Sequence, residues 1–278
     1  MLAAVLIAFR EGLEAALVVG VLLGYLHKSN HGEKARLVWL GVLGAALSSV
    51  VLAGVIQAVG FELEGRPEML FEALTMLLAA GILTWMIFWM RYQARANRVT
   101  LEREMAARLS AGQNSGLVAL AFIAVFREGV ETVLFLSAAA FVDQAVGALV
   151  GALLGLILAG VAGYLVYTSA VRLNVRLFFS VTSLLLLLFA AGLLSSSVHE
   201  LQEAQLLPVL TSHLWNTGTL LSDRSTLGEL LRAVAGYNSS PSLAEVIAYW
   251  GYWIVTLVGV RWLVERKVAR LPAEGQPV

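Results

Sequence analysis

The chain has 278 residues, of which 59% are hydrophobic and 14% charged, and its formal net charge is +0. Soluble domains are about half apolar and about a quarter charged, so this composition excludes an ordinary soluble protein and indicates an integral membrane protein. Because the chain has no cysteine, disulfides and thiolate metal sites are excluded. Any metal must therefore bind through oxygen or imidazole ligands.

Seven apolar stretches are long enough, at about 20 residues each, to cross a bilayer as helices. They lie approximately at 2–26, 37–59, 69–90, 116–140, 145–169, 177–198 and 246–264. The first is expected to be a retained helix, not a cleaved signal, because charges interrupt its apolar core. The sequence predicts one all-α transmembrane domain made of repeat A (1–90), repeat B (116–198), an outer loop (199–245), a seventh helix (246–264) and a cytoplasmic tail (265–278). Within the outer loop, 206–221 is apolar enough to form an interfacial or re-entrant helix.

Most basic residues fall on one side when the connections are assigned alternately to the two sides of the membrane. By the positive-inside rule this side is cytoplasmic, which places the N-terminus outside and the C-terminus in the cytoplasm. The stretch 91–108 is the most basic, and it is expected to continue the third helix and to contact anionic lipid, not nucleic acid. The outer connections are acidic, which would concentrate cations at the outer mouth. An alternative is that outer loops simply tolerate acids.

One six-residue segment occurs twice, at 9–14 and at 126–131, each time inside an apolar stretch. Both copies read Phe-Arg-Glu-Gly-Leu/Val-Glu. Each charge costs roughly 2.5–3.5 kcal/mol at a helix centre, so six amount to about 15–20 kcal/mol before pairing. The first copy lies on a helix that runs inward and the second on a helix that runs outward. The first six helices are therefore predicted to form a 3+3 inverted repeat with a site near the midplane, followed by one C-terminal helix.

The repeated segment supplies four carboxylates. Residues three apart share one face of a helix, so Glu11 projects with Glu14, and Glu128 projects with Glu131. If the two helices face one another, these side chains form a metal site suited to a hard cation such as iron, manganese, magnesium or calcium.

Two arginines and two glycines complete the repeated segment. Arg10 and Arg127 are predicted to balance charge, and the four carboxylates still leave two negative charges in excess. An empty site is expected to hold protons, which a trivalent cation would displace. Gly12 and Gly129 are expected to allow close approach of helices. The alternative is a buried ion-pair network that only fastens two helices, and the excess charge argues against it.

These motifs resemble the oxidase-dependent iron permease family, which includes the ferric permeases of fungi and the EfeU-type permeases of bacterial iron-uptake systems. Its Arg-Glu-x-x-Glu motif matches 10–14 and 127–131, and similarity to the bacterial members extends to 71–79, 199–203, 236–242 and 249–253. The resemblance implies a multi-pass transporter of the bacterial inner membrane that imports ferric iron, with iron (Fe3+ or Fe2+) as substrate and no permanently bound cofactor. It also implies an extracytoplasmic ferroxidase or peroxidase-type partner and an iron-delivery protein.

Four further residues are candidates for accessory binding or capture of the metal near the outer side. They are Glu72, His199, Glu200 and Glu203. The ordinary interpretations are an interfacial glutamate in the third helix and a solvated acidic end of the sixth.

Two other functions remain open. One is transport of another divalent metal such as manganese. The other is a membrane-embedded di-metal oxidase, which is disfavoured because all four histidines lie outside the predicted span interiors.

Overall fold

The computed structural model describes residues 1–93, 96–110, 113–142, 145–168, 175–209, 211, 214–222 and 225–268. Within these residues all regular structure is helical. The elements are α1 (Leu2–Lys28), η1 (Gly32–Lys34), α2 (Ala35–Glu62), α3 (Arg66–Gln93), α4 (Ala96–Ser110), α5 (Asn114–Val142), α6 (Ala145–Tyr167), α7 (Val175–Glu203), α8 (Thr226–Ala235) and α9 (Leu243–Val268).

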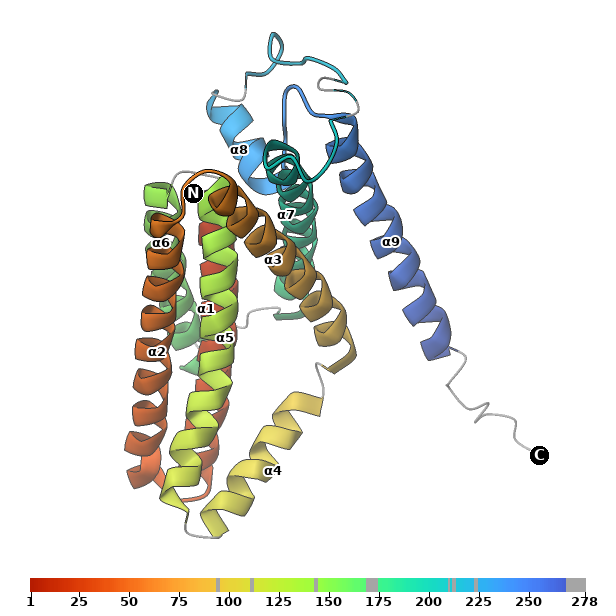
Figure 1. The fold of residues 1–278 in the computed structure, drawn as a ribbon. Coiled ribbons are helices and arrows are strands. Elements are labelled where there is room, and N and C mark those ends of the chain that lie inside the picture. The colour runs from red at the N-terminus through yellow and green to blue at the C-terminus, as the bar shows by residue number, and fades with distance from the viewer. Residues whose placement is uncertain are drawn as a thin grey trace, which may run out of the picture.

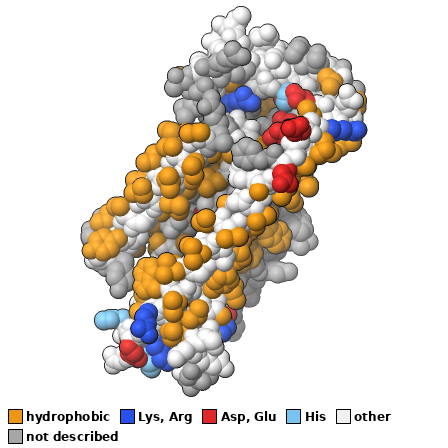
Figure 2. Space-filling view, turned by 60° about the vertical axis from the view of Figure 1, so that its left-hand side comes forward, with side chains coloured by type: hydrophobic (Ala, Val, Ile, Leu, Met, Phe, Trp, Pro, Cys, Tyr) orange, Lys and Arg blue, Asp and Glu red, His pale blue; other side chains and the backbone are white. Residues whose placement is uncertain are grey.

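Four segments are apolar and long enough to cross a membrane: Gly32–Gly60, Arg66–Trp89, Val146–Val166 and Leu177–Glu203. Helices α1 and α5 have comparable lengths, but each carries the three charges of the repeated segment near its middle. Large aliphatic side chains such as Leu47, Val50 and Ile157 are exposed along α2 and α6. Figure 2 shows this apolar surface over the middle of one face, with blue basic side chains gathered at its lower end. The fold is therefore that of a membrane protein.

The long helices alternate in direction, and the two repeats are interleaved. In Figure 1, α1 and α3 run down the view while α2 runs up, and α5, α6 and α7 follow the opposite sequence of directions. Helix α1 packs mainly on α6, α2 on α5, and α3 on α7. Each helix of the first half therefore has its main partner in the second half.

Glycines explain the close contacts in these crossed pairs. A Cβ at Gly12 would lie 2.8 Å from the Cβ of Ala159 on α6, and one at Gly129 would lie 2.9 Å from the Cβ of Ser49 on α2. A Cβ at Gly155 would lie 2.5 Å from the carbonyl oxygen of Val5, so α6 tolerates no side chain there. The expected close approach at the motif glycines is confirmed, and their partners are α6 and α2.

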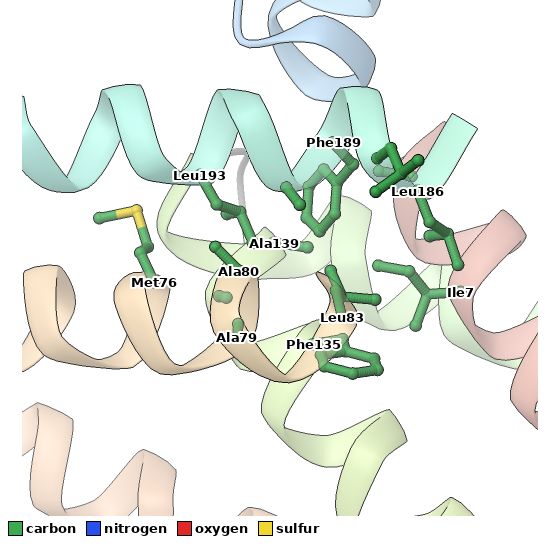
Figure 3. Packing of buried hydrophobic residues seen from close by; sticks show 14 of the residues in the cluster. Ile7, Met76, Ala79, Ala80, Leu83, Phe135, Ala139, Leu186, Phe189 and Leu193 are labelled. Atoms are coloured by element: carbon green, nitrogen blue, oxygen red, sulfur yellow. The ribbon is translucent and has the colours of Figure 1, made fainter. Parts of the chain in front are cut away.

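An apolar cluster joins α3, α5 and α7 with the start of α1. Figure 3 shows Leu83, Phe135, Phe189 and Ile7 directed toward a common centre. Each is at most 4% exposed, so the centre of the cluster is dry.

The structure corrects two predictions. Of 206–221, the described residues form turns and irregular chain, not a helix. Backbone hydrogen bonds instead tie this segment to the chain before α9: Thr217 N donates to Ser239 O and Leu214 N donates to Pro241 O. The basic stretch 91–108 is not a straight continuation of the third helix, since α3 ends at Gln93 and α4 runs in a different direction (Figure 1).

The ends of the predicted helices also shift. Helix α7 extends through Glu203, five residues beyond the predicted end, and α9 begins at Leu243. Helix α8 was not predicted. Of the predicted tail, 269–278 lie outside the described residues.

Candidate metal site between the repeated motifs

The two copies of the repeated segment meet where α1 contacts α5. Glu11 from α1 and Glu128 and Glu131 from α5 each place one carboxylate oxygen within 4.8 Å of the other two. Oxygens bound to one octahedral ion at about 2.1 Å are about 3.0 Å apart when adjacent and about 4.2 Å apart when opposite. The three ligands therefore need to move by only a small amount to bind a common ion.

The carboxylates of this site are buried and only partly satisfied. The side chains of Glu11 and Glu128 are 0% and 3% exposed, and that of Glu131 is 15% exposed. In the described part of the chain, the Oε2 atoms of all three find no hydrogen-bond donor. A buried acceptor without a partner costs about 1–3 kcal/mol, and more when it is charged. Three converging carboxylates, each with one unpaired oxygen, indicate a place for a cation or for protons.

Arg10 is wholly buried within the first copy of the motif. Its Nη1 donates to Glu11 Oε1 at 2.7 Å, and its Nη2 lies 3.0 Å from Glu14 Oε1. The Sδ atom of Met86 on α3 accepts a third contact at 3.5 Å. Glu14 is therefore held by Arg10 and stands beside the three converging carboxylates, not among them.

Arg127 differs from Arg10 although the two sequences match. Its side chain is 49% exposed, and its guanidinium lies 5.3 Å from the ring centroid of Trp89 on α3. Its Nη2 donates to Glu128 Oε1 at 2.6 Å, while its Nε lies 3.7 Å from Glu131 Oε1. The two motifs are thus equivalent in sequence but unequal in environment, and the second copy is the one open to its surroundings.

The two sides of the site also differ in how open they are. A cavity of about 580 Å³ follows α1 beyond the motif; Ala16, two residues past Glu14, and Lys28 both line it. On the opposite side, the apolar cluster of Ile7, Leu83 and Phe135 covers the site. The cavity along α1 therefore starts within one helical turn of Glu14, whereas packed side chains lie on the other side of the motif.

The remaining predicted residues lie beyond that apolar cluster. His199, Glu200 and Glu203 line a second cavity of about 470 Å³ at the top of the bundle, visible as a hollow bordered by acidic and histidine side chains in Figure 2. Glu72 lies close enough to Glu200 and Glu203 for their charges to interact. The cavity also reaches Val142, 11 residues and thus about 16 Å along α5 from Glu131.

Glu245 is a residue of this second cavity that the sequence did not identify as functional. It is 3% exposed, and its Oε1 accepts from Ser242 N at 3.3 Å while Ser242 Oγ accepts from Glu245 N at 3.2 Å. This reciprocal pair is a capping box at the start of α9. The Ser-x-x-Glu spacing predicts such a cap, but nothing in the sequence places the carboxylate against His199, 46 residues away.

Comparison with known proteins identifies the family of the chain. Residues 1–270 match the model of the iron permease FTR1 family. The proteins named ferrous iron permease EfeU from Escherichia coli O157:H7 and Shigella sonnei are each 39% identical over 255 residues, which cover 91% of this chain and 92% of the relative. The EfeU of Yersinia pestis is 38% identical over 91% of this chain and 90% of its own. No solved structure matches the chain. These relatives are named as permeases, which places the chain among transporters and not enzymes, and it belongs to the iron permease FTR1 family.

Proposed function

We propose that the chain imports iron through the site between the two motifs, with Glu11, Glu128 and Glu131 as the first metal ligands. Glu14 joins them when Arg10 shifts, and the arginines balance charge. The observation that carries the proposal is the convergence of three buried carboxylate oxygens from α1 and α5 within 4.8 Å. Carboxylate oxygens suit hard cations, and the family names iron as the cargo.

Charge balance supports a proposal for the oxidation state of the bound ion. The resemblance predicted ferric iron, whereas the names of the relatives specify ferrous iron. Four carboxylates and two guanidinium groups carry an excess of two negative charges, which a divalent ion neutralises and a trivalent ion overshoots by one. An uncompensated charge is expensive inside a membrane. We therefore propose that Fe2+ is the better fit to the site as folded, with Fe3+ as the alternative that requires rearrangement.

The topology we propose has seven membrane spans, the N-terminus outside and the C-terminus in the cytoplasm of a bacterial inner-membrane protein. The alternating directions of the seven long helices and the crossed pairs support it. In that orientation the cavity beside α1 faces the cytoplasm and the apolar cluster closes the outer side. The conformation is then inward-facing, and an inward-negative potential favours entry of a divalent ion by about 4.6 kcal/mol per 100 mV.

Two proposals concern partners and rivals. If Fe3+ is the cargo, an extracytoplasmic ferroxidase or peroxidase-type protein would supply it, with an iron-delivery protein, at the acidic outer end. The strongest rival is transport of another divalent metal such as manganese, because the same carboxylates suit it.

Uptake of radioactive iron into vesicles containing the purified chain tests the proposal. Iron supplied with ascorbate as Fe2+ should enter faster than chelated Fe3+. Glu128→Gln and Glu131→Gln should reduce uptake by at least tenfold while leaving insertion intact. Glu33→Gln, at an exposed position in η1, is the matched control and should have no effect. Normal iron uptake by both motif variants would refute the site, and manganese uptake that is indifferent to iron would refute the cargo.

A further inference from the structure

The second cavity, which is the outer cavity in the topology proposed above, is lined by a histidine whose two ring nitrogens have different carboxylate partners. His199 Nδ1 lies 3.1 Å from Oε1 of Glu245, and His199 Nε2 lies 3.2 Å from Oε1 of Glu203. Glu245 belongs to α9, whereas Glu203 is one turn further along α7 than His199. The histidine therefore links the ends of two helices at the wall of the cavity.

Glu245 is a fixed acceptor and not a free acid. Its Oε2 accepts from Asn238 Nδ2 at 2.8 Å, and its Oε1 accepts from the backbone of Ser242. The side chain of Glu245 is 4% exposed, whereas those of His199 and Glu203 are 47% and 52% exposed. A buried carboxylate held by several donors stays in place and remains an acceptor. When His199 is protonated, Nε2–H can donate to Glu203; when it is neutral, its proton belongs on Nδ1 and the lone pair of Nε2 is available to a metal ion.

The separation of Nε2 and the Glu203 oxygen matches that of two ligands on one metal ion. Ligand atoms at about 2.0–2.1 Å from an ion are about 3.0 Å apart at adjacent octahedral positions and about 3.3 Å apart in a tetrahedron. The observed 3.2 Å lies between these values. Metal-binding histidines nearly always donate their other N–H to a carboxylate or carbonyl, which sets the tautomer and the ring orientation.

We propose that His199 Nε2 and Glu203 form a second site for a divalent transition-metal cation, with Glu245 as its positioning residue. Glu200 lines the same cavity and supplies a further carboxylate, while Arg232 is the one basic side chain among the described residues lining it. The open face of the cavity leaves room for water ligands. This site is separated from the central carboxylates by the apolar cluster, and its binding of metal does not depend on the transport proposed above.

Cobalt binding to the full-length purified chain tests this site. Co2+ is the probe because an imidazole ligand is recognised by outer-shell scattering in X-ray absorption, whereas the central site offers only oxygen ligands. We expect an imidazole signal in the wild-type chain at saturating Co2+ and its loss in His199→Gln. Equilibrium dialysis should show affinity at this site weakened about 10–100-fold in Glu245→Ala, the usual effect of removing such a partner.

Two variants distinguish an effect of Glu245 on the orientation of His199 from a general effect of negative charge on Co2+ binding. Glu245→Gln keeps an oxygen that accepts from Nδ1–H and should retain most of the affinity, whereas Glu64→Gln, at an exposed outer position, should leave binding unchanged. Absence of an imidazole signal in the wild type, its persistence in His199→Gln, or unweakened binding in Glu245→Ala would overturn the proposal. If the central site did not bind Co2+, the X-ray absorption signal of Co2+ with only oxygen ligands would be missing, and the imidazole signal would remain.

Discussion

Replacing the two motif arginines by glutamine should destabilise the protein unequally, although their sequence contexts are nearly identical. Arg10 is 0% exposed and contacts Glu11 and Glu14, whose side chains are 0% and 10% exposed. Removing one partner of a buried ion pair costs about 3–5 kcal/mol because the remaining charge stays buried. Arg10→Gln should therefore be the more damaging change.

Arg127→Gln should cost less because the guanidinium is half exposed, so its ion pair is less deeply buried than that of Arg10. With the side chain 49% exposed, the ion pair contributes about 0.2–1 kcal/mol. The contact with Trp89 adds about 0.5–1 kcal/mol. The expected total is about 1–2 kcal/mol, below the roughly 3–5 kcal/mol expected at Arg10.

Thermal unfolding of the detergent-purified variants measures this difference. For a chain of this size about 1 kcal/mol corresponds to about 2–4 °C, so Arg10→Gln should lower Tm by roughly 6–20 °C and Arg127→Gln by roughly 2–8 °C. Arg36→Gln, at an exposed position on α2, is the control and should shift Tm by less than about 2 °C. Equal shifts for the two motif variants, or a larger shift for Arg127→Gln, would refute the inferred asymmetry.

Three further outcomes follow from the same contacts. Gly155→Ala should lower Tm by several degrees because its Cβ would lie 2.5 Å from a backbone oxygen of α1, whereas Gly160→Ala has nothing within 4 Å and should be neutral in a thermal melt. Since the chain has no cysteine, Arg127→Cys should react with a small charged thiol reagent at least tenfold faster than Arg10→Cys, and equal rates would contradict the difference in exposure. Trp89→Leu should cost about 0.5–1 kcal/mol through loss of the cation–π contact, measured by thermal unfolding with Arg127→Gln as the second mutation of a double-mutant cycle.

The sequence was sufficient to predict the seven long helices and the pairing of the two motifs. Apolar length alone located the seven long helices to within a few residues, because a membrane span must satisfy its backbone internally. The three-residue spacing of Glu128 and Glu131 correctly placed both on the face that meets Glu11. Periodicity within one helix sets such faces, so no knowledge of the rest of the fold was needed.

Contacts between distant segments could not be predicted in this way. The partners of Gly12 and Gly129 are on α6 and α2, which only the interleaving of the repeats determines. The unequal burial of Arg10 and Arg127 depends on how α3 packs beside each. The motif sequence does not indicate this difference, because its two copies are nearly identical. The segment 206–221 was wrongly predicted as helical because the prediction used only its apolar residues. It could not include the backbone hydrogen bonds that tie the segment to 239–241.

The packing of the helices also indicates which parts can move. Helices α1, α2, α5 and α6 form crossed pairs in which glycines bring backbones into contact, so sliding within a pair would create clashes at Gly155 and Gly41. Helices α3 and α7 meet α1 and α5 mainly through the side chains of the apolar cluster, and α8 and α9 pack on α7. Side-chain contacts can rearrange more readily than backbone contacts. Opening the outer side is thus expected to separate the α3–α7 unit from the four glycine-packed helices, which breaks the apolar cluster and carries the His199–Glu245 pair along with α7 and α9.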